Sequence, residues 1–489
     1  MAANITDHLQ LIDGRGCPAT GNGWIDSIDP STGRIWARIP AGGASDIDLA
    51  VRAAARALPA WRETAPAQRA ALLRSWARLV RDNLDTLWRL DAADNGRPRR
   101  EAEPAIAGAA MQMEYVAGLA ETITGTTVSV SPTASTYTVR EPYGVVGLII
   151  PWNAPLAMFL AKATAALAAG NTLVVKPPEI ASVSVLAAAE LVAEAGIPAG
   201  VVNIVTGEGA SAGDALARHD DVRMISFTGS TQTGRRITEA STGNLKALSL
   251  ELGGKSPNIV FADADIDAAV AGVTAGIFTA SAGQACIAGS RILVQDSIFE
   301  DFIEKVRLRA SQMTLGSPPD AGTDMGPVVS RVQFDRIRGY IESAEADGAK
   351  LAFGGRSGSE LFPRNEDLAG GYYIEPTLLT TDDPGLQICR EEVFGPVAVA
   401  LRFSDEAEAL DIANGSTFGL AAGVWTQNLP RAQRMITGLD AGTVWVNTYR
   451  RLHWALPFGG HKESGIGTSN GPQTLDEWLE QKSVWIEYS

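Results

Sequence analysis

Cysteine and histidine are scarce in this sequence. Its 489 residues include only three cysteines, Cys17, Cys286 and Cys389, and four scattered histidines. An odd, widely spaced set of cysteines does not make a disulfide framework, and none of these residues has the spacing of metal ligands. The sequence therefore predicts a reducing compartment, which we take to be the cytoplasm, and no metal site.

Excess basic charge and long apolar runs are also missing. The net charge of −15 argues against a protein that binds a nucleic-acid backbone. No segment reaches the roughly 18 apolar residues that span a bilayer, and the most apolar stretch, 144–170, is interrupted by Pro151, Asn153, Pro155 and Lys162. The N-terminus lacks the basic and apolar segments of a signal peptide. We expect neither nucleic acid nor a membrane as a partner.

The rest of the composition is typical of a soluble enzyme. Hydrophobic residues make up 45% of the chain and charged residues 20%. At about 150 residues per domain, the length suggests about three units. Residues 48–118 have helical periodicity, and from 145 onward apolar strand-like segments alternate with Ala-rich helical ones. This alternation predicts an α/β fold with a parallel sheet.

The segments of the first α/β cycle can be given approximate bounds. The predicted strands are 145–150, 172–176, 201–205, 224–228 and 247–252, and the predicted helices are 156–169, 181–195, 211–218 and 231–240. A second cycle begins near 258 and continues to about 460. Residues 126–144, with a turn at Ser131–Pro132, predict a two-stranded excursion that needs a partner surface. The C-terminal segment 483–489 alternates like an edge strand.

Three side chains are candidates for carrying chemistry. Cys286 lies in the segment GQACIAGSR, and Glu251 and Asn153 each follow a predicted strand. The carboxyl ends of parallel strands are where α/β enzymes place their ligands. Each residue also has a purely structural explanation: a buried small hydrophobe for Cys286, a surface acid for Glu251 and a helix N-cap for Asn153.

Together these side chains suit acyl chemistry. A thiolate attacks a carbonyl to form an S-acyl enzyme, and an asparagine amide stabilises the oxyanion. A carboxylate with a raised pKa then activates water for hydrolysis. The same groups would fit a cysteine hydrolase, but no histidine stands near any of these segments.

Seven short motifs carry a family resemblance. In order, they are PWNAPL (151–156), KPPE (176–179), FTGS (227–230), ELGGKSP (251–257), GQAC (283–286), EEVFGPV (391–397) and PFGGHKESGIG (457–467). Each motif alone is weak, but seven in the right order make a chance match very unlikely. The sequence resembles the NAD(P)-dependent aldehyde dehydrogenase superfamily over essentially its whole length.

The resemblance implies a fold and a domain organisation. We expect an aldehyde dehydrogenase-like α/β fold with a five-stranded Rossmann-type cofactor domain, an α/β catalytic domain and a small β oligomerisation element. The expected bounds are 1–122 and 143–252 for cofactor binding, 253–463 for catalysis, and 123–142 with 470–489 for oligomerisation. A homodimer or homotetramer is implied, because pairing with another subunit would protect exposed strand edges.

The resemblance also implies catalytic roles. Cys286 matches the nucleophile, Glu251 the general base for deacylation and Asn153 the oxyanion donor, helped by the backbone N–H of Cys286. Lys162 matches a lysine that sets the electrostatics near the active site, with a solvated helix residue as the structural alternative. The implied reaction oxidises an aldehyde to a carboxylate through a cysteine thiohemiacetal and thioester.

Cofactor residues follow from the same motifs. Lys176 and Glu179 match groups that hold the adenosine ribose, and Glu392 matches the carboxylate on the nicotinamide ribose. The Gly229–Ser230 turn opens a helix whose N-terminus would meet the pyrophosphate. We expect NAD, with NADP as an alternative. The full set of expected cofactor residues is Trp152, Lys176, Glu179, Gly209, Phe227, Gly229, Ser230, Leu252, Glu392 and Phe394.

Two departures from the family pattern affect the expected function. After GIG the family often has Arg-Glu, where this chain has Thr468 and Ser469, which puts the proton route from the general base in doubt. Ala154 and Ala161 stand where many relatives have aromatics, which predicts a wider substrate tunnel. We therefore expect a bulky, polar or anionic aldehyde.

The segment 449–458 is expected at the tunnel mouth, with a solvated surface loop as the alternative. Its arginines could hold a distal carboxylate. The expected substrate residues are Ala154, Met158, Arg450, Arg451, Leu452, His453 and Phe458. Two other functions stay open: a CoA-acylating semialdehyde dehydrogenase, against which Glu251 argues, and a catalytically silent relative that serves as a binding or structural protein.

Overall fold

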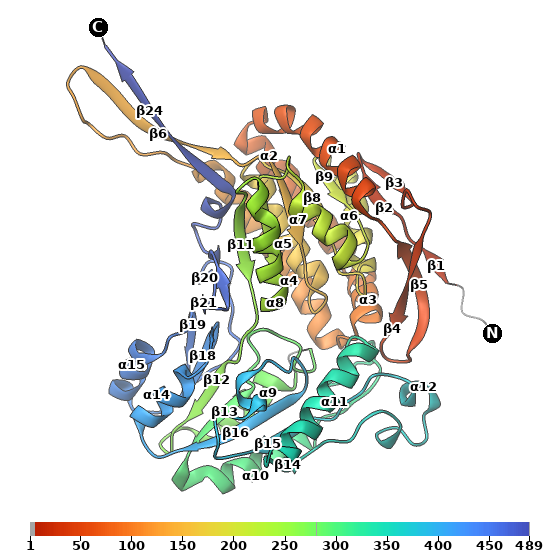
Figure 1. Cartoon of the computed structure of the whole chain (residues 1–489), viewed down its shortest axis with the longest axis vertical. Coiled ribbons are helices and arrows are strands. Elements are labelled where there is room, and N and C mark those ends of the chain that lie inside the picture. The colour runs from red at the N-terminus through yellow and green to blue at the C-terminus, as the bar shows by residue number, and fades with distance from the viewer. Residues whose placement is uncertain (1–4, 280, 489) are drawn as a thin grey trace.

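The computed structural model describes residues 5–279 and 281–488 and contains two large sheets with helices around them (Figure 1). Residues 1–4 and 489, at the ends of the predicted ranges 1–122 and 470–489, lie outside the described residues. The chain passes from the first sheet to the second directly after Glu251. This crossing leads from the end of β11 (Ala247–Glu251) into β12 (Pro257–Val260) of the second sheet.

Five parallel strands form the centre of the first sheet, and their predicted positions are confirmed. Their order across the sheet is β11 (Ala247–Glu251), β10 (Met224–Thr228), β7 (Val145–Ile149), β8 (Thr172–Lys176) and β9 (Val202–Ile204). Short antiparallel strands extend it at both edges, namely β22 (Gly465–Ile466) beside β11, and β2 (Gln10–Ile12) and β3 (Arg15–Cys17) beyond β9.

Helices cover both faces of this sheet because successive strand residues point to opposite sides. Val175 packs in one core with Trp76 and Phe159, while Val174 packs in the other with Ile47. The helices are α1 (Ala44–Glu63), α2 (Pro66–Asp82), α3 (Leu84–Asn95), α4 (Arg99–Leu119), α5 (Pro155–Ala168), α6 (Val183–Glu194), α7 (Asp214–Arg218) and α8 (Thr231–Ala240). The helix predicted at 211–218 is α-helical only from Asp214, because Gly209–Gly213 forms a wider π-helical turn.

The second sheet has seven strands and repeats the α/β pattern. All its neighbouring strands are parallel except β14 against β15. Their order is β14 (Lys350–Phe353), β15 (Thr377–Thr380), β16 (Val397–Phe403), β13 (Arg291–Gln295), β12 (Pro257–Val260), β18 (Ala421–Trp425) and β19 (Thr443–Val446). The helices of this part are α9 (Ile266–Ile277), α10 (Phe299–Ala310), α11 (Arg331–Ala346), α12 (Glu366–Ala369), α13 (Gln387–Arg390), α14 (Glu406–Asn414) and α15 (Leu429–Gly438).

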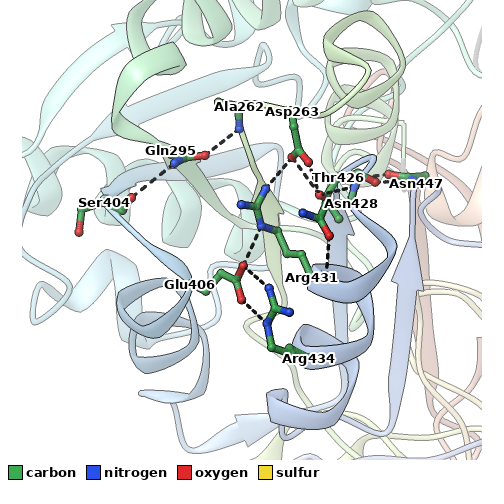
Figure 2. A network of polar contacts seen from close by, with 10 residues as sticks. All are labelled: Ala262, Asp263, Gln295, Ser404, Glu406, Thr426, Asn428, Arg431, Arg434 and Asn447. Atoms are coloured by element: carbon green, nitrogen blue, oxygen red, sulfur yellow. Dashed lines mark hydrogen bonds and ion pairs between the residues drawn. The ribbon is translucent and has the colours of Figure 1, made fainter.

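A polar network joins the strand ends and helices at one side of the second sheet (Figure 2). Arg431 of α15 donates to Asp263, which follows β12, at 2.8 Å and to Glu406 at the start of α14 at 2.9 Å. Arg434 adds two further bonds to Glu406. Hydrogen bonds from the two arginines hold the pKa of Glu406 at about 2, so it stays charged at ordinary pH. The network fixes α14 and α15 against the sheet.

A long two-stranded arm extends from the body of the molecule (Figure 1). The strand β6 (Ala134–Pro142) pairs over its whole length with β24 (Leu479–Glu487). The predicted two-stranded excursion at 126–144 is therefore only partly right. Its first half forms one isolated bridge, Thr127 to Tyr137, because β6 finds its continuous partner in the C-terminal segment instead.

The remaining elements are short. They are β1 (Thr6–Asp7), β4 (Trp24–Asp29) and β5 (Arg34–Pro40) in one small sheet, and the strand pairs β17 (Phe418–Gly419) with β21 (His461–Lys462) and β20 (Pro457–Phe458) with β23 (Ser469–Asn470). Among the residues that the structure describes, no helix is long and apolar enough to cross a membrane, and no group of three or more His, Cys, Asp or Glu side chains could hold a metal ion.

Candidate active site

One cavity brings the four predicted catalytic residues together. Cys286, Glu251, Asn153 and Lys162 all line a cavity of about 440 Å³. Glu251 ends β11, Asn153 follows β7, Lys162 lies on α5, and Cys286 lies in the loop between α9 and β13. The site is thus assembled from both α/β units, at the end of the sheet where parallel strands place ligands.

Glycine shapes the loop that presents Cys286. Gly283 has φ +73°, and a Cβ there would lie 1.9 Å from the carbonyl oxygen of Gly395. Gly254 passes equally close, since its Cβ would lie 2.3 Å from the carbonyl oxygen of Cys286. The GQAC, ELGGKSP and EEVFGPV motifs therefore pack backbone against backbone around the thiol, which explains their glycines.

The resting thiol is protonated. Burial, with smaller contributions from the nearby carboxylates Glu392 and Glu251, raises the pKa of Cys286 to about 12, against the effect of backbone N–H groups. A base must therefore take its proton before the sulfur can attack a carbonyl.

Glu251 is placed to be that base. Its side chain is 7% exposed, so the surface-acid interpretation is wrong. Burial raises its pKa to about 7, with a further increase from Glu477 that Lys162 and the Ser469 hydroxyl oppose. Within the described part of the chain, its Oε2 atom has no hydrogen-bond partner. A buried carboxylate with a free oxygen and a pKa near neutrality suits general-base chemistry.

Asn153 is not a helix N-cap and Lys162 is not a solvated helix residue, because each side chain makes a different contact. Asn153 does not cap α5, because the helix begins at Pro155 after Ala154. Its Nδ2 atom instead donates to the carbonyl oxygen of Gln284 at 2.8 Å, which fixes the amide beside the thiol loop. Lys162 is 6% exposed and donates from Nζ to Ser226 Oγ at 2.9 Å, so it is no solvated helix residue.

The expected adenosine-ribose and pyrophosphate groups lie at the ends of β8 and β10. Lys176 and Glu179 form an ion pair of 2.6 Å. Burial alone would raise the pKa of Glu179, but Lys176 and backbone N–H groups hold it below its ordinary value. Ser230 caps α8 by accepting from the Thr233 backbone N–H at 3.2 Å, which leaves the other first-turn N–H groups facing outward.

The residues expected at the nicotinamide lie near Cys286, since Glu392 raises the pKa of its thiol. Glu392 accepts from the Gly254 N–H at 2.9 Å, and burial raises its pKa to about 7. A Cβ on Gly253 would lie 2.6 Å from Glu392 Oε2. Trp152 and Phe394 meet edge to face with centroids 5.2 Å apart. Of the other expected cofactor residues, Gly209 adjoins Glu179, while Phe227 and Leu252 are buried beside the Gly229 turn and Gly234.

These residues fit a dinucleotide. The Oγ1 atom of Thr228, directly before the Gly229–Ser230 turn, is buried and has no hydrogen-bond partner within the described residues. A phosphate binds to an open helix N-terminus and to an unpaired hydroxyl, and a ribose hydroxyl binds to a carboxylate such as Glu179 or Glu392.

Most of the expected substrate residues line the cavity. Ala154, Met158, Arg450, Leu452, His453 and Phe458 do so, as does Ala161. Arg451 does not: its side chain is exposed, and the structure uses its backbone carbonyl as an acceptor for Trp445 Nε1 at 2.8 Å. A one-residue step along an irregular loop turns neighbouring side chains to different sides, which the sequence does not reveal.

Several lining residues were not predicted from the sequence. They come from α4, from the loop before it and from the segment before β24, and include Arg97, Gly108, Gln112, Asn470, Thr474, Glu477 and Trp478. None belongs to a catalytic motif. One feature of the sequence pointed to the C-terminal segment: Thr468-Ser469 replaces the usual Arg-Glu there.

Comparison with known proteins identifies the family of the chain. A family model described as the aldehyde dehydrogenase family matches residues 18–484. The chain belongs to the aldehyde dehydrogenase family. It is an NAD(P)-dependent aldehyde dehydrogenase, and its fold is the aldehyde dehydrogenase fold.

Individual relatives cover nearly the whole of this aldehyde dehydrogenase. An aldehyde dehydrogenase from Alternaria alternata is 44% identical over 94% of this chain and 92% of its own length. The NAD+ complex of an aldehyde dehydrogenase from Bacillus cereus superposes with a TM-score of 0.95 at 41% identity, covering 99% of this chain and 97% of that one. A betaine aldehyde dehydrogenase from Staphylococcus aureus, also solved with NAD+, gives 0.95 at 37% identity, covering 98% and 94%.

Proposed function

We propose that this aldehyde dehydrogenase oxidises a bulky, polar or anionic aldehyde to its carboxylate, with NAD and water as co-substrates. The observation that carries the proposal is the shared cavity of Cys286, Glu251 and Asn153, with Arg450 farther along the same wall. A nucleophile, a base and an oxyanion donor around one space are the parts that acyl chemistry needs.

In the first half of the reaction Glu251 takes the thiol proton as Cys286 Sγ bonds to the aldehyde carbon. The Asn153 amide and the Cys286 N–H donate to the oxyanion. Bound NAD supplies the acceptor for the hydride that leaves this carbon. In the second half Glu251 takes a proton from water, whose oxygen bonds to the thioester carbon. The C–S bond then breaks, and the sulfur regains a proton.

For the cofactor, NAD is preferred over NADP in this proposal. The Glu179 carboxylate stays charged through its ion pair with Lys176, so it can accept from a ribose 2′-hydroxyl. A 2′-phosphate at that place would meet like charge, which Lys176 offsets in part. Trp152 and Phe394 would flank the nicotinamide, and Glu392 would accept from its ribose.

For the substrate, three cationic side chains line the cavity, Arg97, Lys162 and Arg450, and Arg450 is the one that the segment 449–458 contributes. Arg450 is half-buried and donates from Nη1 to the Ala275 carbonyl at 3.1 Å, and a guanidinium has further N–H groups with which to bind a carboxylate. Glu101 lies near enough to interact with it, and burial raises the pKa of Glu101 against the effect of Arg450 and Arg97. Ala154 and Ala161 leave room for a bulky substrate.

The test is a panel of aldehydes that includes acidic, polar neutral and short straight-chain members, followed by NADH absorbance. Arg450→Ala should lower kcat/KM for an acidic aldehyde by about tenfold or more while changing its neutral analogue far less. Arg451→Ala is the matched control and should change neither. Equal losses on both substrates, or none, would refute anion recognition by Arg450.

Water as the acyl acceptor distinguishes this proposal from the CoA-acylating alternative. Glu251, with its pKa near 7, is the group that hydrolysis needs and that transfer to a thiol does not. NADH formation by the purified enzyme without CoA should be multiple-turnover. A requirement for CoA would favour the acylating alternative, and absence of NADH with every aldehyde despite cofactor binding would favour the catalytically silent one.

The arm suggests a homodimer or homotetramer. Among the described residues the outer edge of β24 pairs with no other strand, the outer edge of β6 is paired only around the Thr127–Tyr137 bridge, and Trp485 is 60% exposed. Open strand edges and exposed aromatics are covered in stable oligomers. We assign 123–142 and 470–489 to oligomerisation, 1–122 and 143–252 to cofactor binding and 253–463 to catalysis, in a cytoplasmic enzyme. Light scattering should give two or four protomer masses, and Trp485→Glu should lower that number.

A further inference from the structure

The reaction requires Glu251 to lose a proton in the middle of each turnover. Glu251 first receives the thiol proton and must later receive a proton from water, yet one carboxylate holds only one. Each oxidation of an aldehyde to a carboxylate with NAD+ and water releases two protons in all. A route from Glu251 to solvent is therefore part of the proposed function, on which this inference rests.

A second carboxylate lines the same cavity. Glu477 lies in the short turn before β24, and Trp478, which is 1% exposed, anchors that turn to the first α/β unit. The Trp478 carbonyl accepts from Asn171 Nδ2 at 3.0 Å. Glu477 is half-buried, so it has contact with the cavity and with solvent.

The structure fixes the carboxylate of Glu477 from two sides. Ser249, two residues before Glu251 on the same face of β11, donates from Oγ to Glu477 Oε1. On the other side Gly467 has φ +96°, and a Cβ there would lie 2.9 Å from the same oxygen. The backbone thus leaves space for this carboxylate at the strand that carries Glu251.

Ser469 carries a hydroxyl in the cavity that both carboxylates line. Its hydroxyl interacts with Glu251, and Ser469, Glu251 and Glu477 line one cavity. In the described residues neither Ser469 Oγ nor Glu251 Oε2 has a hydrogen-bond partner at normal distance, so a small approach or a single water would connect them. A hydroxyl can accept one proton while it donates another.

We propose that Glu477 is the proton acceptor for Glu251, reached through the hydroxyl of Ser469. In each transfer an O–H bond on Glu251 breaks and one forms on Ser469, whose own proton passes to Glu477. Glu477 then gives the proton to solvent. Glu477 is thereby a positioning and relay residue that acts through Glu251, and it serves in place of a glutamate at the Ser469 position.

Several other titratable groups surround these carboxylates. Lys162 faces Glu251 from α5, and Cys286 faces it from the thiol loop. Around Glu477 lie Asp476, which pairs with Arg140 at 3.6 Å, and Tyr143 and Glu480, since Glu477 and Glu480 both raise the pKa of the Tyr143 hydroxyl. Glu480 is exposed on β24 and does not line the cavity, which makes it a matched control.

The experiment compares rapid-mixing traces of NADH for wild type, Glu477→Gln and Glu480→Gln at saturating NAD and aldehyde. Glu477→Gln should keep the first-turnover burst and lower the steady-state kcat by about tenfold or more. Imidazole, as a diffusible base, should restore part of that kcat in a concentration-dependent way. The acid limb of its kcat profile should also move to lower pH, because a negative charge beside Glu251 is removed. Glu480→Gln should behave as wild type.

Further variants distinguish a loss of proton transfer from a loss of folded structure. Ser469→Ala should share the slow steady state, Glu477→Asp should recover much of kcat, and Ser469→Glu placed in Glu477→Gln should recover it as well. An unchanged kcat in Glu477→Gln would overturn the relay, as would an equal loss of burst and steady state or the absence of imidazole rescue. If Glu477→Gln does not fold, normal kcat in folded Ser469→Ala would overturn it. A CoA requirement in wild type would instead overturn the proposed function itself.

Discussion

Two carboxylates lie near Cys286, those of Glu251 and Glu392, and their surroundings differ. Glu251 is buried and Glu392 half-buried, yet loss of solvent raises the pKa of each carboxyl to about 7, and both raise the pKa of the thiol. Glu392 accepts a hydrogen bond from Gly254 and lies against Gly253, whereas Oε2 of Glu251 has no partner in the described structure. A carboxylate fixed by a hydrogen bond suits cofactor binding, and one with an unpaired oxygen suits proton transfer. The hydrogen bonds, and not the pKa values, therefore distinguish the two carboxylates.

Removing the Cys286 thiol should have the largest effect on turnover. Cys286→Ala should lower turnover by more than about a thousandfold, because no other group on the cavity wall can form the thioester. Affinity for NAD, measured by calorimetric titration, should stay within about threefold. Cys17→Ala, far away on β3, is the control and should retain activity. Turnover of Cys286→Ala within tenfold of wild type would contradict covalent catalysis.

Exchanging each flanking carboxylate for its amide tests the comparison directly. Glu251→Gln should slow the NADH burst and lower steady-state kcat still more, by about a hundredfold, since the amide can take a proton neither from the thiol nor from water and deacylation depends on it most. Glu392→Gln should instead raise KM for NAD by about tenfold through loss of a charge-assisted hydrogen bond. Stopped-flow and steady-state absorbance separate the two. Loss of the burst itself in Glu251→Gln would mean that Glu251 mainly activates the thiol.

The pH dependence of kcat should also show which of the two carboxylates acts as the base. Glu251 acts as a base only when deprotonated, so kcat should fall as pH drops through its raised pKa of about 7. Glu251→Gln should lack this acid limb, while Glu392→Gln should keep it. A limb that survives in Glu251→Gln would place the controlling ionisation on another group.

The smallest predicted effect concerns the far end of the cofactor site. Glu179→Gln should narrow the ratio of kcat/KM for NAD over NADP by about tenfold, because the like charge facing a 2′-phosphate is removed while Lys176 remains. Parallel assays with the two cofactors measure this ratio. A wild-type preference for NADP would show that Glu179 turns away from the ribose.

Much of the fold followed from patterns within single segments. The strands at 145–150, 172–176 and 224–228 were found because their apolar runs are bounded by helical ones. The arm was predicted less well, because β6 pairs with β24 across more than three hundred residues and no local pattern reports a partner so distant. The same limit explains why the side chains of α4 were not predicted in the cavity.

The sequence by itself determined the chemical identity of the site. The motifs around Asn153, Glu251 and Cys286 named the groups, because close backbone packing requires specific glycines that remain visible in the sequence. Only the tertiary structure decided how those groups work. It turned Arg450 inward and Arg451 outward, left Glu251 unpaired while holding Glu392, and brought Glu477 into the cavity. Orientation, desolvation and proton routes depend on atoms contributed by distant segments, which meet only when the chain has folded.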